Sequence, residues 1–236
     1  MKMKLTSSLP FYTPEVMNLI IVGAGRIGTH LTQLALQDGH TITLIEANAR
    51  RAHDASQEYD AQVLQADIAQ GGILDEAGAD RADGLVATTS DDSANLMAMF
   101  LGIEYRVETL LSVVNDTRHK RLFERLGVHI LLDPEMILAQ HLYGILRRPK
   151  VEDVITLAGG AEMFEVTLAP DSPLVGRSPA EASHTGLLDD GLLIVLLKRG
   201  EQSLVPSGQF ALAAGDHLTV FSQEPVRESH LKVFTG

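Results

Sequence analysis

Three glycines near the start of the chain have the Gly-x-Gly-x-x-Gly spacing of a phosphate-binding loop, and they follow the apolar run 19–22. In such a loop the first glycine permits a tight turn and the second lets a phosphate approach the backbone. The third lets the following helix pack closely on the strand. The free amides at the start of that helix then face the anion. The residues expected to line this phosphate site are Gly23, Gly25, Arg26, Ile27 and Gly28.

A second chemical group lies at the end of the next predicted strand. Residues 41–45 alternate β-branched and aliphatic side chains, and Glu46 follows them directly. Dinucleotide-binding folds place an acid about 20 residues beyond the glycine loop, where its carboxylate accepts hydrogen bonds from both ribose hydroxyls. The same charge repels a 2′-phosphate, which disfavours NADP. The alternative interpretation of Glu46 is an ordinary acid at the start of a helix.

Beyond the glycine loop and the acid, the sequence contains no recognisable motif of catalytic residues. It has no cysteine, and no tyrosine is followed four positions later by the lysine of short-chain dehydrogenases. It also lacks a Gly-x-Ser-x-Gly elbow, a Walker phosphate loop and paired metal-binding histidines. The nine histidines are scattered, and the acid pairs 91–92 and 189–190 are expected to cap helices or form turns. These features favour the sensing of a nucleotide over its turnover.

The composition argues against several other classes of protein. The formal net charge is −12, whereas nucleic-acid binding needs a concentrated basic surface, so we expect no nucleic-acid partner. The only basic run of note is 147–150, which we interpret as a solvated linker, with a phosphate-binding site as the alternative. No apolar run approaches the roughly 18 residues of a membrane span, and residues 1–16 lack the pattern of a secretion signal. We therefore expect a cytoplasmic protein.

A parallel sheet is the element that must position the glycine loop and the acid. Apolar strand-length runs alternate with helical patterns up to residue 146, and this order predicts an α/β fold with a Rossmann-like, doubly wound parallel sheet. The strands are expected at 19–22, 41–45, 61–65, 84–88, 109–114 and 128–131, and helices at 26–38, 49–59, 68–77, 91–105, 116–126 and 134–146.

Two of these predicted helices, 91–105 and 134–146, are apolar around most of their circumference. A helix that is apolar on most sides is buried on most sides. Nothing later in the pattern covers the second helix, so we predict a subunit interface there. For the first helix, packing under the C-terminal region is an equal alternative.

After residue 152 the pattern becomes rich in strands. Strands are expected at 154–157, 163–168, 192–198 and 217–221, helices at 178–183 and 224–233, and a hairpin turn at Gly159-Gly160. We therefore expect a small α+β C-terminal domain. The predicted organisation is an irregular N-terminal extension (1–16), a nucleotide-binding domain (17–133), an interface helix and linker (134–150) and the α+β domain (151–236).

Short motifs follow the glycine loop in a specific order along the chain. They are Ala66-Asp67, Asp91-Asp92, Asn95-Leu96, Leu126-Gly127-Val128, Pro134-Glu135, the run 172–178 (Ser-Pro-Leu-Val-Gly-Arg-Ser) and Gly215-Asp216. Because of the order and spacing of these motifs, the chain from Met17 onward resembles the RCK (KTN) regulatory subunits of Trk/Ktr-type potassium uptake systems. Related units are gating domains of potassium channels. The single glycine loop fits the type with one RCK unit per chain.

The resemblance implies roles for individual residues. Asp67 matches a position beside the adenine, and Thr88 borders the same crevice. Arg26 matches a loop arginine that reaches the phosphates, partly across a dimer, which favours ATP or ADP somewhat over NAD(H). Glu135 matches an acid that contributes, in some relatives, to a divalent-cation site between subunits. The segment 65–68 departs from the Gly-Asp-Ala-Thr of many relatives, which affects the expected adenine contacts.

Together these features predict a nucleotide-sensing regulatory subunit, not an enzyme, at the inner face of the cell membrane. The resemblance implies homodimers that assemble into a ring, an octamer in the single-unit type, and gate a membrane potassium-translocating subunit. The regulatory ligand is expected to be ATP or ADP, or NAD(H). Two alternatives are an NAD-dependent oxidoreductase with an unrecognised active site, and a soluble gating fragment of a potassium channel in which residues 1–16 are a linker remnant.

Overall fold

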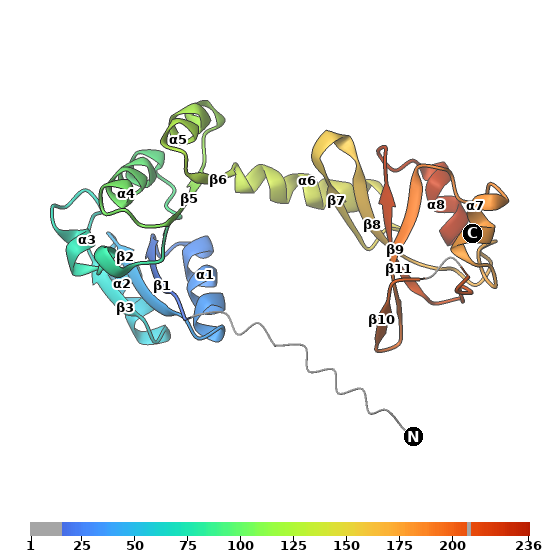
Figure 1. Ribbon diagram of the computed structural model, residues 1–236, viewed down its shortest axis with the longest axis horizontal. Helices are drawn as coiled ribbons and strands as arrows, with labels where there is room; N and C mark the ends of the chain where they lie inside the picture. The colour runs from blue at the N-terminus through green and yellow to red at the C-terminus, as the bar shows by residue number, and fades with distance from the viewer. Residues whose placement is uncertain (1–15, 207–208) are drawn as a thin grey trace, which may run out of the picture. The chain divides into compact units, whose positions relative to one another are not determined.

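The computed structural model describes residues 16–206 and 209–236, and it divides them into two compact units (Figure 1). The first unit ends at Pro134 and the second begins at Glu135. The predicted N-terminal extension, apart from Val16, lies outside the described residues.

The first unit is built on a parallel sheet with the strand order β3-β2-β1-β4-β5-β6. The strand order reverses between β1 and β4, which creates the crevice where doubly wound folds bind ligands. The Rossmann-like prediction is therefore confirmed. The strands are β1 (Asn18–Val22), β2 (Thr41–Glu46), β3 (Gln62–Gln65), β4 (Gly84–Ala87), β5 (Thr109–Val114) and β6 (His129–Leu132).

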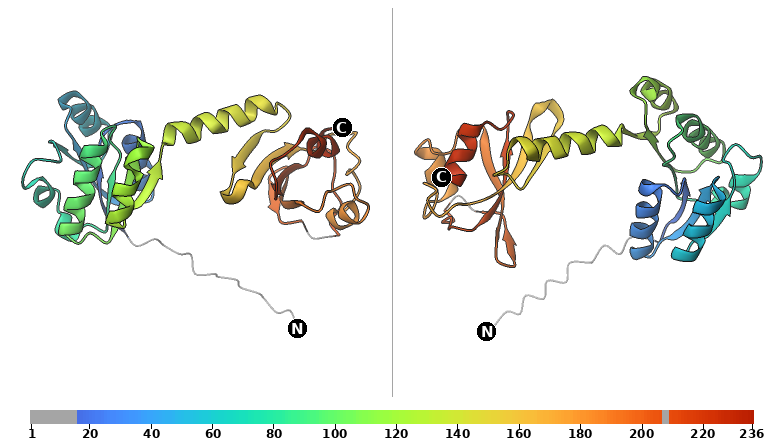
Figure 2. Two further views of the ribbon diagram at one scale, coloured as in Figure 1. Left: turned by 90° about the horizontal axis from the view of Figure 1, so that it is seen from above. Right: turned by 180° about the vertical axis from the view of Figure 1, so that it is seen from behind.

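Helices cover both faces of this sheet (Figure 2). They are α1 (Arg26–Gln37), α2 (Ala49–Glu58), α3 (Ile73–Glu76), α4 (Asp92–Glu104) and α5 (Lys120–Leu126). Helices α1 and α2 contribute Ala35 and Ala55 to the apolar cluster on one face. Met99 of α4 and Phe123 of α5 are fully buried in the cluster on the other face. The alternation of strand and helix thus gives the sheet two covered faces, as a parallel sheet requires.

Two predicted helices are shorter than expected. The helix predicted at 68–77 contracts to α3, because Gly72 adopts a left-handed conformation (φ 83°) and α3 begins only after it. The helix predicted at 116–126 splits into a 3-10 turn, η2 (Thr117–His119), followed by α5. A further 3-10 turn, η1 (Ala79–Arg81), leads into β4.

The second unit begins with α6 (Pro134–Arg147), whose first residue belongs to the first unit, and contains an antiparallel sheet with the order β10-β9-β11-β8-β7. Its core includes an edge-to-face pair of aromatic rings, Phe164 and Phe234, with centroids 5.8 Å apart. The prediction of a small α+β domain is confirmed. The remaining elements are β7 (Asp153–Thr156), η3 (Ala158–Gly160), β8 (Glu162–Thr167), α7 (Pro179–His184), β9 (Leu192–Arg199), β10 (Gln202–Leu204), β11 (His217–Ser222) and α8 (Glu228–Thr235).

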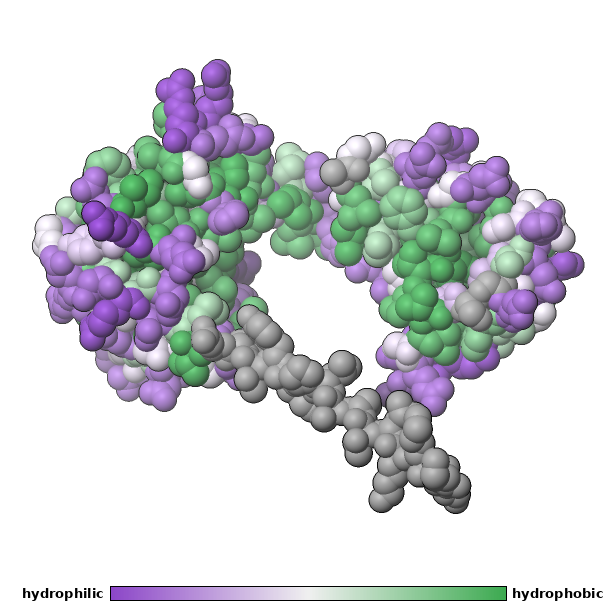
Figure 3. All heavy atoms as spheres, viewed as in Figure 1, coloured by the Kyte–Doolittle hydropathy of each residue, from purple (hydrophilic) through white to green (hydrophobic). Residues whose placement is uncertain are grey.

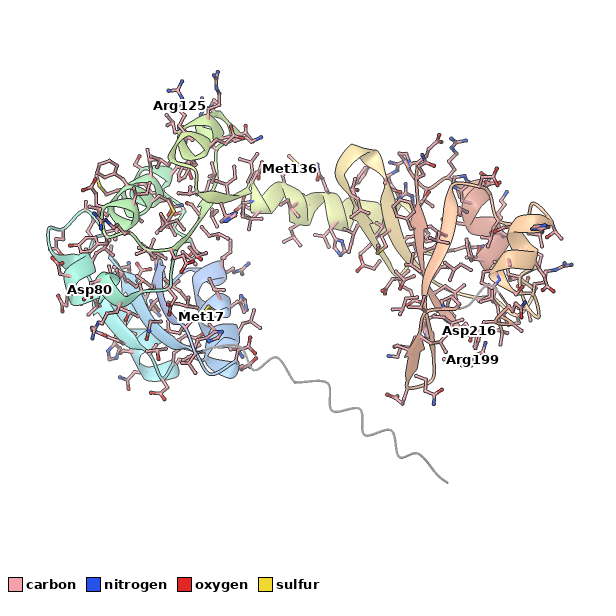
Figure 4. All side chains as sticks on the ribbon, viewed as in Figure 1. Met17, Asp80, Arg125, Met136, Arg199 and Asp216 are labelled. Carbon is pink, nitrogen blue, oxygen red and sulfur yellow. The ribbon has the colours of Figure 1, made fainter. Side chains whose placement is uncertain are left out.

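Two details of this unit differ from the sequence prediction. The short strand β10 was not expected; it forms a hairpin with β9. Helix α8 begins at Glu228 rather than at residue 224, and Pro225 explains the delay because the residue before a proline is disfavoured in helices. An ion pair joins the end of β9 to the residue before β11, where the partly exposed Arg199 guanidinium donates to the buried Asp216 carboxylate at 2.6 and 2.7 Å (Figure 4).

Apolar side chains are exposed along α6 (Figure 3). Leu146, for example, is 78% exposed. The other large apolar side chains exposed on this helix are Met136, Ile137, Leu138, Leu142 and Tyr143. Helix α4 also exposes Met97, Phe100 and Ile103. No helix within the described ranges is long and apolar enough to cross a bilayer.

Candidate nucleotide-binding site

The predicted ligand-binding residues gather at the carboxyl edge of the parallel sheet. The glycine loop connects β1 to α1, and Glu46 ends β2. Asp67 follows β3, and Thr88 directly follows β4. Because neighbouring parallel strands end at the same edge, four segments far apart in sequence meet around one crevice.

Each of the three loop glycines has a different structural role. Gly23 has a φ of 102°, and its N–H donates to the carbonyl oxygen of Ile45 at 2.8 Å, so the turn is tied to β2. A Cβ at Gly28 would lie 1.9 Å from the carbonyl oxygen of Gly23, which no side chain can tolerate. A Cβ at Gly25 would meet no described atom within 4 Å. Gly25 is thus the position that leaves space beside the backbone.

Thr88 supports the loop from β4. Its buried Oγ1 donates to the carbonyl oxygens of Val22 and Gly23, at 3.1 Å each. This hydroxyl therefore holds the turn at the end of β1. Contact between Thr88 and a ligand stays a prediction.

Glu46 is buried, with 3% of its side chain exposed, and connects three segments of the site. Its Oε2 accepts from the N–H of Ala24 at 2.7 Å, while its Oε1 accepts from the N–H of Asn48 at 2.7 Å and from the Arg51 guanidinium at 2.8 Å. Burial raises the pKa of Glu46. The hydrogen bonds from Arg51 and the two amides outweigh burial and hold the pKa below its ordinary value. The carboxylate is therefore ionised at neutral pH.

Arg51 is a site residue that the sequence analysis missed. It lies in the first turn of α2, which Asn48 caps by accepting hydrogen bonds from the N–H groups of Arg50 and Arg51 at 3.1 Å. This cap fixes the start of α2 so that the Arg51 guanidinium reaches Glu46. In the sequence, only its position five residues after Glu46 pointed to this contact. The contact could be recognised only once the start of α2 was known.

The other predicted contacts lie on the surface. Arg26 begins α1 and is exposed, and Ile27 beside it is 38% exposed. Asp67 is also exposed, and its Oδ1 accepts from the N–H of Ala69 at 2.9 Å. These side chains are open to solvent at the same edge of the sheet as Glu46. Their roles in ligand binding stay predictions.

The predicted cation site at Glu135 is incomplete within one subunit. Glu135 is exposed in the first turn of α6. In the part of the chain that the structure describes, no group of three or more histidine, aspartate or glutamate side chains is arranged to hold a metal ion. A site that gathers ligands from two subunits stays a prediction.

The acid pair 91–92 divides into two roles. Asp91 caps α4, as expected, by accepting from the N–H of Ser93 at 2.7 Å. Asp92 is instead buried, and it accepts hydrogen bonds from both Asn115 and the N–H of Asp116 at 2.8–2.9 Å, with the His119 ring 2.8 Å away. Burial raises the pKa of Asp92, and these contacts outweigh burial and lower it. The cluster joins α4 to the end of β5.

Two family models match the chain, the TrkA-N domain over residues 19–134 and the TrkA-C domain over residues 163–226. The chain is 31% identical over 221 residues to the Trk system potassium uptake protein TrkA homolog of Methanothermobacter thermautotrophicus. That alignment covers 93% of this chain and 100% of the relative. The chain belongs to the TrkA family. The resemblance inferred from the sequence motifs is therefore confirmed.

Further TrkA relatives agree in length with this chain. The TrkA homolog of Pyrococcus abyssi is 27% identical over 224 residues, covering 92% of this chain and 97% of the relative. TrkA of Mycobacterium tuberculosis is 29% identical over 208 residues, covering 86% of this chain and 91% of the relative. Sequence similarity to TrkA proteins thus extends across both compact units.

Solved structures of RCK domains share the fold of this TrkA-family chain. The GsuK RCK domain has a TM-score of 0.58 at 15% identity, covering 94% of this chain and 48% of that one. A GsuK channel described as bound to NAD has a TM-score of 0.60 at 16% identity, covering 94% of this chain and 40% of that one. This chain thus spans less than half the length of either structure, and the likeness concerns the fold.

Proposed function

We propose that this TrkA-family chain is a nucleotide-sensing regulatory subunit, rather than an enzyme, and that it gates a membrane potassium transporter or channel. The observation that carries the proposal is the buried Glu46 carboxylate 2.7 Å from the Ala24 amide of the glycine loop. An ionised ribose-binding acid and a phosphate-binding loop are then directly connected. The potassium uptake role rests on the relatives, which are named Trk system potassium uptake proteins.

The contacts of Glu46 suggest how a nucleotide acts. Ribose hydroxyls that donate to this carboxylate compete with Ala24 and Arg51 for its oxygens. The ligand thereby changes the restraints on the loop and on the start of α2. A ligand shifts a conformational equilibrium only by binding one geometry better than the other, and this exchange of partners supplies such a difference.

NAD(H) and ATP or ADP remain the proposed ligands. The GsuK channel described as bound to NAD supports a nicotinamide dinucleotide. The exposed Arg26 at the start of α1 supports a ligand with more phosphate charge. Gly25, with open space where a Cβ would lie, is the proposed point of closest phosphate approach. Asp67 is the proposed neighbour of the adenine.

The exposed apolar residues of α6 support assembly. We propose that they form the contact between subunits, giving homodimers that build a ring, an octamer in this single-unit chain. A divalent cation between subunits at Glu135 belongs to the same proposal. The ring would lie in the cytoplasm against the membrane protein that it regulates.

Isothermal titration calorimetry of the full chain with NAD, NADH, ATP and ADP tests the site. We expect at least one nucleotide to bind, and Glu46→Gln to weaken it by about tenfold, because a charge-assisted acceptor is lost. Glu108→Gln, which removes an exposed acid away from the crevice, is the matched control and should leave the affinity unchanged. Absence of binding by all four nucleotides contradicts the proposal, and substrate-dependent NADH production indicates an oxidoreductase instead.

A further inference from the structure

The unit from Glu135 onward contains a groove of about 910 Å³ with an excess of positive charge on its walls. One wall is the basic run 147–150, and the other is the face of α8 together with the turn that precedes it. The cationic lining residues are Arg147, Arg148, Lys150, Arg227 and Lys232; the acidic ones are Glu162 and Glu228. The chain as a whole has a formal net charge of −12, so this concentration of positive charge is local.

A nearly buried ion pair joins the two walls. Arg148 Nη1 lies 3.0 Å from Glu162 Oε2, and only 12% and 11% of these two side chains are exposed. Glu162 Oε2 also accepts from the N–H of Val226 at 2.7 Å, in the turn before α8. The basic run is further anchored by Val151, which is buried and donates its N–H to the carbonyl oxygen of Arg148 at 2.9 Å. The two walls of the groove are therefore connected through Glu162.

Three of the lining cations have no carboxylate partner among the residues that the structure describes. They are Arg147, Lys150 and Lys232. Lys150 Nζ donates to the Thr235 hydroxyl at 3.2 Å, and the Arg147 guanidinium lies 5.8 Å from the centroid of the Tyr143 ring. The charges of Arg148 and Arg227 are instead balanced by Glu162 and Glu224. Three lining cations, one on α8 and two in the basic run, thus lack a carboxylate partner, and one lining acid, Glu228, is paired with none of the described cations.

The groove also has apolar walls. Pro149 and Pro225 line it at the surface, and Val226 and Leu231 lie buried beneath them. Its volume lies within the range of about 300–1,000 Å³ that is typical of small-molecule sites. A ligand that fills it should therefore combine a negatively charged group with an apolar body.

We propose that this groove binds a phosphomonoester with an apolar or aromatic body. Three cations without carboxylate partners and the acid Glu228 leave two positive charges, which match a phosphate dianion better than a single carboxylate, and lysine and arginine both suit phosphate oxygens. The apolar walls contact the body of the ligand. This site lies entirely in the second unit and is independent of the nucleotide proposed at the glycine loop.

Calorimetric titration of the full chain with phenyl phosphate tests the proposal. We expect binding to the wild type, and binding at least about tenfold weaker to the double variant Lys150→Gln/Lys232→Gln, because two charged donors are removed. The matched control Lys120→Gln/Lys198→Gln has the same change in net charge at exposed lysines outside the groove, and should retain wild-type affinity. Inorganic phosphate should bind more weakly than phenyl phosphate, since it has no apolar body.

Three results would overturn the proposal: no binding of phenyl phosphate, equal affinity in the groove variant and the wild type, or an equal loss in the control variant. Titration of Gly25→Ala, which blocks the proposed phosphate approach at the loop, separates this site from the glycine loop. Wild-type affinity for phenyl phosphate is expected there, and its loss would assign the binding to the loop instead.

The source of the phosphomonoester is distinguished with vesicles. Phosphatidylcholine vesicles containing phosphatidate are sedimented with the protein, with and without phenyl phosphate. Co-sedimentation that phenyl phosphate reverses indicates a lipid headgroup. Calorimetric binding of phenyl phosphate without co-sedimentation indicates a free small molecule.

Discussion

The Oε2 atom of Glu46 accepts a hydrogen bond of 2.7 Å from the backbone N–H of Ala24, so the end of β2 holds the glycine loop directly. The other carboxylate oxygen holds the start of α2 through Asn48 and Arg51. One buried acid therefore contributes both to the stability of the site and to its proposed recognition of ribose. Any ligand that takes over this acid must also change the loop.

Replacing Glu46 by alanine should lower the free energy of unfolding by about 1–3 kcal/mol, because the buried N–H of Ala24 loses its hydrogen-bond partner. Replacing Arg51 by alanine should cost less than about 1 kcal/mol, since the arginine is more than half exposed and both backbone contacts to Glu46 remain. Urea denaturation measures both values. An Arg51→Ala loss as large as that of Glu46→Ala would contradict this account of the acid.

Alanine substitutions at Gly28 and Gly25 should distinguish an effect on protein stability from an effect on nucleotide affinity. Gly28→Ala places a Cβ 1.9 Å from the Gly23 carbonyl oxygen, so we expect it to destabilise the fold by about 1–3 kcal/mol or more. Gly25→Ala meets no described atom within 4 Å, and the φ of Gly25 is −78°, which alanine adopts readily. We expect its thermal midpoint to stay within a few degrees of the wild type.

The nucleotide affinity of Gly25→Ala completes this test. Gly25→Ala should weaken nucleotide binding at least about tenfold if phosphate approaches the backbone there. Calorimetry measures this directly. Unchanged affinity in a folded Gly25→Ala protein would remove Gly25 from the proposed site.

The Arg199–Asp216 pair should make the second unit sensitive to acid. Burial raises the pKa of Asp216, but the hydrogen bonds from Arg199 and the Ala213 amide outweigh burial and lower the pKa below its ordinary value of 3.8. The ionised carboxylate therefore stabilises the fold above about pH 4, and this contribution is lost as the pH falls through the folded-state pKa.

Asp216→Asn isolates that contribution. We expect the variant to be about 1–3 kcal/mol less stable than the wild type at pH 7, and the difference to shrink at pH 3. Thermal denaturation followed by circular dichroism at both pH values measures the change. A difference that does not depend on pH would show that the charge of Asp216 contributes little.

The exposed apolar residues of α6 should determine assembly. Leu146→Glu places a charge on a side chain that is 78% exposed, and we expect native mass measurement to detect smaller assemblies than those of the wild type. Val205→Glu changes a side chain that is 76% exposed outside α6 and serves as the control. A wild-type monomer, or equal dissociation by both variants, would contradict an interface on α6.

The sequence by itself determined the order of strands and helices, the glycine loop and the candidate acid, because these depend on local patterns of apolar residues and on spacing. It also determined the family, since short motifs in a specific order survive when most positions change. The predicted boundaries differ from the observed ones where one residue alters the backbone, as Gly72 does before α3 and Pro225 does before α8.

Only the tertiary structure decided which groups contact one another. The sequence indicated Glu46 but gave no sign that Arg51 and Ala24 would share its oxygens. It left open whether the run 147–150 is a solvated linker or a phosphate-binding site, and folding places this run beside α8 as a wall of a groove. Each of these sites combines segments from different elements, and the packing of those elements brings together charges and hydrogen-bonding groups that spacing along the chain does not reveal.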